Sequence, residues 1–144
     1  MRKGMTLIEL LVVIGVLMVI LAIAAFNGQR TLKGQEQAAF LRSLQSFFWQ
    51  GATEAASRGA LLDVVFTGNR LEIRNGTQVL RTLEVPQGVS LTLPRGVVAR
   101  LTPPGKVEDA SGNSLTRPLS FRVSLGSKTY TYVVSLIGEA KVEP

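Results

Sequence analysis

The side chains that could do chemistry in this sequence are carboxylates and arginines, because the chain has no histidine and no cysteine. Histidine is the usual proton-transfer group near neutral pH and the commonest metal ligand, and cysteine supplies thiolates and disulfides. Glycine-rich phosphate loops, nucleophile elbows and the H-E-x-x-H zinc pattern are also absent from the sequence. We therefore predict that the protein is not an enzyme, uses no cofactor and has no metal centre. A membrane-anchored enzyme is the weakest of the functional hypotheses.

One carboxylate stands in an unusual place. Glu9 lies at the head of a segment, Leu10–Phe26, that contains no charged or strongly polar side chain. With the residues before Glu9, this segment is close to the ~20 residues that a helix needs to cross a bilayer core. A carboxylate inside such a helix is costly and marks a functional site by default. If the chain were cut after Gly4, the new amino group on Met5 would lie about one helical turn from Glu9, and an ammonium on a neighbouring subunit could pair with the carboxylate and set the register between subunits.

Three other interpretations of this segment compete. Arg2 and Lys3 before the apolar run favour a cytoplasmic N-terminus, but a basic start is also typical of a secretory signal peptide, for which Ala22-Ile23-Ala24 would be the cleavage site. The segment could also be an uncleaved anchor on an unrelated domain, or a buried core helix. Glu9 has no purpose in the first two, and the apolar run lacks the polar face that a helix of a soluble domain shows.

The residues Arg2-Lys3-Gly4 and the following Met5-Thr6-Leu7-Ile8-Glu9-Leu10-Leu11-Val12-Val13-Ile14 resemble the class III signal of type IV prepilins and type II secretion pseudopilins. The resemblance implies that a prepilin peptidase cleaves between Gly4 and Met5 and N-methylates Met5, and that Glu9 serves in subunit assembly. The family usually begins its mature chain with Phe, where this sequence has Met5. Implied partners are other pilin or pseudopilin subunits, the peptidase and an inner-membrane assembly platform.

The resemblance also implies a location and a domain order. The subunit is expected to cross the bacterial inner membrane once, with its N-terminus cytoplasmic, before it enters a pilus or pseudopilus in the periplasm or at the cell surface. We predict a leader at residues 1–4, a transmembrane or filament-core half of a helix at 5–28, an amphipathic half at 29–58 and a β-rich globular head at 59–144.

The amphipathic half should run from about Gln29 to Ser57, with Gly59 as its stop signal. Its apolar side chains recur at steps of three and four, and those of the stripe are Leu41, Leu44, Phe48, Ala52 and Ala55, widened by Phe40, Phe47 and Trp49. Because the stripe needs a surface to cover it, we expect Phe47, Phe48 and Trp49 in the core or in a subunit contact. The break in the family's helix, often a Pro, could be supplied here by Gly28.

Beyond Ala60 the pattern changes to short strands separated by turn residues. The predicted strands are Leu62–Phe66, Arg70–Arg74, Gln78–Val85, Val89–Leu93, Val97–Leu101, Leu119–Leu125 and Thr129–Leu136, and Gly138 precedes a terminal segment, Glu139–Val142. Asn75-Gly76 predicts a type I′ hairpin, and a polar loop should follow Pro103 as far as Asn113. The fold class is therefore α+β, with a long N-terminal helix packed on a C-terminal antiparallel head of one or two sheets, which is pilin-like. This layout resembles the GspH/FimT-like minor pilins and pseudopilins, and the lack of cysteine also favours a minor subunit.

The charge pattern offers a second function. The net charge is +6 and falls to +4 when Arg2 and Lys3 leave with the leader, which is mildly basic. Clustered arginines can bind phosphates, so a DNA-binding minor pilin for uptake in natural transformation is the alternative to a purely structural subunit. The candidate DNA contacts are Arg70, Arg74, Arg81 and Arg122, although Glu72 shares a strand face with the first two. Glu108-Asp109, with Ser111 and Asn113, fits a solvated turn better than a cation site.

Overall fold

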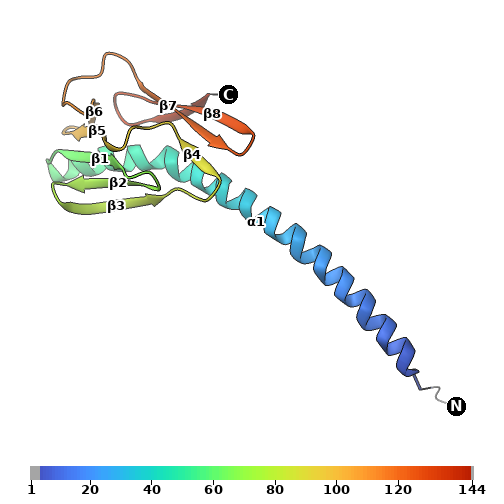
Figure 1. The fold of residues 1–144 in the computed structure, drawn as a ribbon. Coiled ribbons are helices and arrows are strands. Elements are labelled where there is room, and N and C mark those ends of the chain that lie inside the picture. Colours follow the sequence, from blue (N-terminus) through green and yellow to red (C-terminus); the bar gives the residue numbers. More distant parts are fainter. Residues whose placement is uncertain (1–3, 144) are drawn as a thin grey trace. The chain divides into compact units, whose positions relative to one another are not determined.

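A computed structural model describes residues 4–143 of the chain. The fold divides into two compact units, one ending at Glu36 and one beginning at Gln37, and each is described by itself. A single helix, α1 (Leu7–Arg58), contributes to both units. It passes through Gly28 without interruption, so the helix break that the sequence suggested at Gly28 is not present (Figure 1).

The first unit is the apolar part of α1 and the residues just before it. Every side chain from Gly4 to Glu36 is exposed in the isolated subunit. This helix is long and apolar enough to cross a membrane by length and composition. The interpretation of the segment as the core helix of a soluble domain is not supported, because no side chain from Gly4 to Glu36 is buried within this described unit. The segment instead presents an apolar surface that requires lipid or other protein around it.

The end of α1 is set by Gly59, as the sequence predicted. Gly59 adopts a φ of +60°, a left-handed conformation that glycine reaches without a steric penalty. Its amide donates to the Ala56 carbonyl over 3.4 Å, and the Ala60 amide donates to the Ala55 carbonyl over 3.3 Å. These two bonds form the Schellman motif, which satisfies helix carbonyls that have no partner within the helix.

The β-rich part of the second unit forms two antiparallel sheets. The five-stranded sheet has the order β3-β2-β1-β5-β6, and the four-stranded sheet has the order β4-β7-β8-β9 (Figure 1). The strands are β1 (Leu62–Phe66), β2 (Arg70–Asn75), β3 (Gln78–Glu84), β4 (Val89–Leu91), β5 (Gly96–Thr102), β6 (Lys106–Glu108), β7 (Leu119–Leu125), β8 (Lys128–Val134) and β9 (Ala140–Glu143). The predicted α+β class is confirmed, and the head forms two sheets where one or two were expected. All seven predicted strands are present, the terminal segment contains β9, and β6 lies inside the segment predicted as loop.

The β2–β3 hairpin is confirmed, but its predicted type I′ turn is wrong. Asn75 pairs with Gln78 across the hairpin, so the two central residues of the turn are Gly76 and Thr77. Gly76 has a φ of +60°, while Thr77 does not have a positive φ. A type I′ turn needs positive φ at both central positions, whereas glycine at the first position alone is typical of type II′. The ladder therefore extends one residue further than the Asn-Gly signal suggested.

The core joins the helix to both sheets. The buried side chains of α1 repeat on one stripe, and they are Phe40, Leu44, Phe47, Phe48, Ala52 and Ala55, with Gly51 between them. The rings of Phe48 and Phe121 lie 6.1 Å apart, and those of Phe121 and Tyr132 stack at 5.7 Å. Aromatic contacts of this kind contribute about 0.5–1.5 kcal/mol each beyond the area they bury. The predicted stripe is confirmed for these residues, whereas Leu41 is only partly buried and Trp49 is half-exposed at 54%.

Two glycines allow the sheets and the terminal loop to approach α1 closely. A Cβ on Gly51 would lie 2.6 Å from the Cδ1 atoms of both Ile73 and Leu101 in the five-stranded sheet. Gly138, in the turn between β8 and β9, packs on the helix backbone, where a Cβ would lie 3.0 Å from the Phe48 carbonyl oxygen and from the Ala52 Cβ. Glycine at these two positions thus allows α1 to pack closely against the five-stranded sheet and the terminal loop.

Candidate functional site

The predicted processing segment lies immediately before α1. Gly4 and Met5 precede the helix in a stretch without regular secondary structure, and the Met5 side chain is 64% exposed. No described atom outside its immediate neighbours comes within 4 Å of a Cβ built on Gly4. Residues 1–3, which include Arg2 and Lys3 of the predicted leader, lie outside the described residues. The bond between Gly4 and Met5 is therefore on an open and non-helical part of the described chain.

Glu9 lies in the first turn of α1 and is bonded to Thr6. The Thr6 backbone amide donates to Glu9 Oε2 over 2.9 Å, and the Thr6 hydroxyl donates to the same oxygen over 3.2 Å. In return, the Glu9 amide donates to the Thr6 hydroxyl oxygen over 3.4 Å, the longest of the three bonds. The Leu10 amide donates to the Thr6 carbonyl over 3.1 Å, which makes Thr6 the cap residue of the helix. Thr6 and Glu9 thus form a capping box, in which each side chain satisfies the backbone amide of the other.

Thr6 is a site residue that the sequence analysis missed. The signal was present, because Thr6-Leu7-Ile8-Glu9 has the spacing of a capping box directly before an apolar run.

Comparison with known proteins bears on the same segment. Residues 1–25 match the family model of the prokaryotic N-terminal methylation motif. This motif is the N-terminal signal of type IV prepilin-like precursors. No curated protein and no solved structure matches the chain. The match covers the N-terminal segment alone, so the assignment of the β head to the GspH/FimT-like branch stays a prediction. Type IV pilin-like proteins are structural, and an exposed apolar N-terminal helix fits anchoring in the inner membrane.

Two of the arginines predicted as DNA contacts are paired with an acid. Arg70 and Arg74 flank Glu72 on the outer side of β2, opposite the buried side chains of Leu71 and Ile73. The Arg70 Nε lies 2.7 Å from one Glu72 carboxylate oxygen, and the Arg74 guanidinium bonds to the other. The two arginine side chains cover Glu72, whose exposure is 2%. The three residues together carry a net charge of only +1, which reduces their attraction for phosphates.

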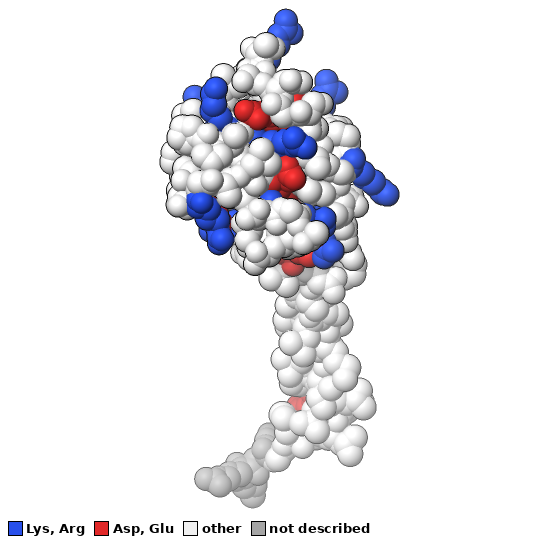
Figure 2. Space-filling model, turned by 90° about the vertical axis from the view of Figure 1, so that its left-hand side faces the viewer, with Lys and Arg blue, Asp and Glu red and all other residues white. Residues whose placement is uncertain are grey.

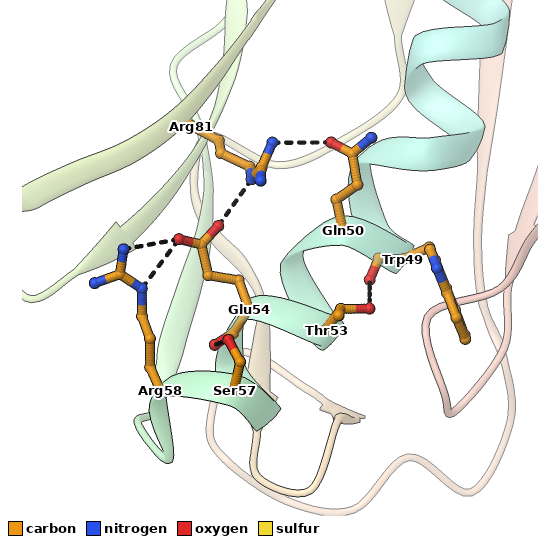
Figure 3. Close-up of polar contacts among 7 residues, drawn as sticks. All are labelled: Trp49, Gln50, Thr53, Glu54, Ser57, Arg58 and Arg81. Carbon is orange, nitrogen blue, oxygen red and sulfur yellow. Dashed lines mark hydrogen bonds and ion pairs between the residues drawn. The ribbon is translucent and has the colours of Figure 1, made fainter.

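A third predicted contact, Arg81, faces the helix. Its Nε donates to Glu54 Oε2 over 2.8 Å, and its Nη1 donates to the Gln50 side-chain oxygen over 3.0 Å (Figure 3). Arg58 bonds to the other oxygen of Glu54 at 2.9–3.0 Å, so the carboxylate is held between two guanidinium groups. The hydrogen bond from Arg81 holds the pKa of the Glu54 carboxyl below its usual range, and Arg58 lowers the pKa further. These contacts line a shallow hollow beside the half-exposed Trp49.

Arg122 stands apart from the other three arginines. It lies on β7 between the buried side chains of Phe121 and Val123, so it projects from the outer side of the four-stranded sheet. Within residues 4–143 no acidic side chain forms an ion pair with it. The structure therefore distributes the four predicted arginines over three surfaces and does not gather them. Figure 2 shows the resulting pattern on one face of the globular unit, where acidic side chains lie between spread basic ones.

The Glu108-Asp109 segment organises a turn. Asp109 Oδ1 accepts hydrogen bonds from the Ser111 amide over 2.9 Å and from the Asn113 amide over 2.8 Å. These backbone donors hold the pKa of the Asp109 carboxyl below its usual range. In the part of the chain that the structure describes, no three carboxylate side chains gather as they would around a metal ion. The Asp109 carboxylate thus stabilises its own loop by accepting hydrogen bonds from backbone amides.

Proposed function

We propose that this chain is a structural subunit, a minor pilin or pseudopilin, of a type IV pilus or type II secretion pseudopilus. The observation that carries the proposal is the match of residues 1–25 to the methylation motif. The matched segment includes the start of an apolar helix whose side chains are exposed in the isolated subunit. In a filament, the helices of other subunits would bury this surface. The head would then remain at the filament surface, held by the amphipathic part of α1.

Processing would occur between Gly4 and Met5, with N-methylation of Met5 by the prepilin peptidase. The open, non-helical backbone at Gly4 supports access for a peptidase. Residues 1–4 would form the leader, 5–28 the membrane and filament-core part, 29–58 the amphipathic part and 59–144 the head. The subunit would wait in the inner membrane with its N-terminus in the cytoplasm until an assembly platform moves it into the filament. Glu9 would then pair with the amino group of a neighbouring subunit.

Mass spectrometry of the protein isolated from its native host tests the processing step. We expect a mature chain that begins at Met5 and carries one added methyl group. A Gly4→Leu variant, which places a bulky side chain at the cleaved bond, should accumulate as the uncleaved precursor, while Gly4→Ala should be processed at least in part. A mature chain that begins at Ala25 would show cleavage at the Ala22-Ile23-Ala24 site and would overturn the proposal. Deletion of the gene should abolish piliation or secretion, and a deletion strain with normal filaments and secretion would exclude the assembly role.

Capture of DNA for uptake is the second candidate function. It is supported by Arg122, which has no acidic partner in the described chain and lies beside Ser120, Thr92 and Thr131 at a shallow depression. The pairing of Arg70 and Arg74 with Glu72 and of Arg81 with Glu54 counts against a broad contact. A salt-dependent mobility shift with a fragment that begins at residue 31 tests it, with Arg122→Ala as the weakened variant. No shift at low salt removes this function.

A further inference from the structure

We propose that Thr6 is a positioning residue that holds the Glu9 carboxylate in one orientation, with one oxygen bonded to its own helix and the other left to bind an ammonium group. The inference deepens the proposed function and rests on it for the identity of the ammonium, which is the processed amino terminus of another subunit. It assigns to Thr6 a part in assembly that the methylation motif match does not specify.

The two carboxylate oxygens of Glu9 have different partners. Both Thr6 donors, the backbone amide and the hydroxyl, bond to Oε2 of Glu9, and Oε1 takes part in none of these bonds. Two donors on one oxygen restrict the rotation of a side chain that is otherwise exposed. They favour one orientation of Oε1 relative to the helix before a partner arrives.

The same bonds make Glu9 tolerable at the edge of an apolar helix. A carboxylate in a lipid-facing segment costs about 2.5–3.5 kcal/mol when it is central and less near an end. A negative charge in the first turn of a helix is favoured by the helix dipole, and two hydrogen bonds satisfy one oxygen without water. The Thr6 amide, which would otherwise lack a partner at the helix start, is satisfied at the same time. Thr6 thus offsets part of the penalty that Glu9 brings to the membrane.

The capping box survives processing. All of its atoms belong to residues from Thr6 to Glu9, so cleavage of the bond after Gly4 breaks none of its hydrogen bonds. The Thr6 nitrogen remains a peptide amide, because Met5 becomes the new terminus. An incoming ammonium therefore meets a carboxylate that is already oriented, and less conformational entropy is lost when the ion pair forms.

A spectroscopic experiment tests the geometry without any need for assembly. The full-length chain, with 15N at Thr6 and 13C at the Glu9 carboxyl, is placed in vesicles of phosphatidylethanolamine and phosphatidylglycerol for solid-state NMR. We expect a direct dipolar contact between the two nuclei in the wild type and in Thr6→Ser, and a weakened contact in Thr6→Val, which keeps the amide and the branched shape but loses the hydroxyl. Absence of the contact in the wild type, or an equal contact in Thr6→Val, overturns the inference.

Assembly provides the second readout. The measured quantity is the fraction of cleaved subunit that is recovered in purified filaments from strains with each variant. Loss of a hydrogen bond to a charged group should lower incorporation of Thr6→Val about tenfold, while cleavage at Met5 stays normal and Thr6→Ser behaves like the wild type. Because Thr6 acts through Glu9, the double variant Thr6→Val/Glu9→Gln should incorporate no worse than Glu9→Gln alone.

The outcomes separate the inference from the proposed function. If the losses of incorporation caused by Thr6→Val and by Glu9→Gln multiply in the double variant, Thr6 acts independently of Glu9. If Thr6→Val is incorporated normally, the Thr6 hydroxyl is not needed. Each result overturns the positioning role. A wild-type chain that is not cleaved at Met5, or is absent from filaments, would instead contradict the proposed function. The spectroscopic contact would then still decide whether Thr6 holds Glu9.

Discussion

The hydroxyl of Tyr132 on β8 donates a hydrogen bond to the backbone carbonyl of Leu41 on α1 over 3.0 Å. The two residues are 91 positions apart in the sequence, and the bond ties the four-stranded sheet directly to the helix. Tyr132 has no exposed surface, and its ring stacks on Phe121. The buried hydroxyl is thus satisfied at a place where the helix would otherwise contact the sheet through apolar groups alone.

Replacement of Tyr132 by Phe should lower the free energy of unfolding of the head by about 0.5–1.5 kcal/mol. The ring and its stacking remain, and the Leu41 carbonyl keeps its partner within the helix, so the loss is that of one hydrogen bond. Urea unfolding of a fragment that begins at residue 31, followed by circular dichroism, measures the difference. Tyr130→Phe on the same strand is the control, because Tyr130 is only partly buried. Equal effects of the two substitutions would contradict the role of the bond.

The same hydroxyl predicts a stability change at high pH. Burial raises the pKa of Tyr132 to about 12, above its ordinary value of 10.0. Because the folded state favours the protonated form, this contribution is fully present below pH 10 and is lost as the pH rises through about 12. The stability of the wild-type fragment should therefore fall between these values more steeply than that of Tyr132→Phe. If the free energy of unfolding changes equally with pH in the two proteins, the folded state does not favour the protonated hydroxyl of Tyr132.

Glu54 predicts a stability change at low pH. Its pKa is lowered, so its contribution is present above the ordinary carboxyl pKa of 4.5 and is lost as the pH falls through the lower folded value. We expect Glu54→Gln to cost about 1 kcal/mol at pH 7, because the arginine partners are half-exposed, and to cost much less at pH 3. Urea unfolding at the two pH values measures this. Glu36→Gln, an exposed acid on the same helix, is the control and should show no such pH dependence. A constant cost of Glu54→Gln at both pH values would contradict the ion pairs in Figure 3.

Much of the fold could be predicted because its signals are local. Gly59 ends α1 where the apolar spacing stops, and the alternating strands of the head lie within a residue or two of their predicted bounds. The strand β6 was missed because it has three residues and exists through pairing with the end of β5, for example Leu101 with Val107. Its formation depends on tertiary contacts that no short window of sequence contains.

The candidate site shows the same division. Gly4, Met5 and Glu9 could be proposed from the sequence because their spacing is a local pattern, and the segment that contains them, residues 1–25, matches the methylation motif; the roles of the three residues stay predictions. The bond between Arg81 and Glu54 joins residues 27 positions apart and could not be found from spacing, because a strand and a helix must first be packed together. Charge counting alone therefore overstated how many arginines are available to bind phosphate.

Gly138→Ala should destabilise the head by at least about 2 kcal/mol. Gly138 has a φ of +85°, and its new Cβ would meet the Phe48 carbonyl oxygen and the Ala52 Cβ at 3.0 Å, both on the rigid helix. Gly126→Ala is the matched control, because Gly126 also has a positive φ of +61° but no atom lies within 4 Å of its Cβ. The control should show the backbone strain alone, about 1 kcal/mol. If both variants unfold at the same urea concentration, the close approach of the terminal loop to α1 contributes nothing.

Glu72→Gln should destabilise the head more than the loss of an exposed acid, because Glu72 is buried. The substitution leaves Arg70 and Arg74 facing each other without the carboxylate that both now bond, and a buried charged pair that loses one partner costs about 3–5 kcal/mol. Water reaches both arginines, whose side chains are 46% and 33% exposed, so we expect about 2 kcal/mol. Glu84→Gln is the control, since Glu84 lies opposite Arg70 on β3 but is exposed, and it should change stability by less than about 0.5 kcal/mol. Urea unfolding measures the stability of both variants.

The low-salt mobility shift tests whether the same ion pairs also reduce DNA binding. If Glu72 suppresses phosphate binding by Arg70 and Arg74, Glu72→Gln should increase DNA binding while Glu84→Gln does not. An equal small loss of stability in the two variants, with an unchanged mobility shift, would show that the arginines are held by their own packing.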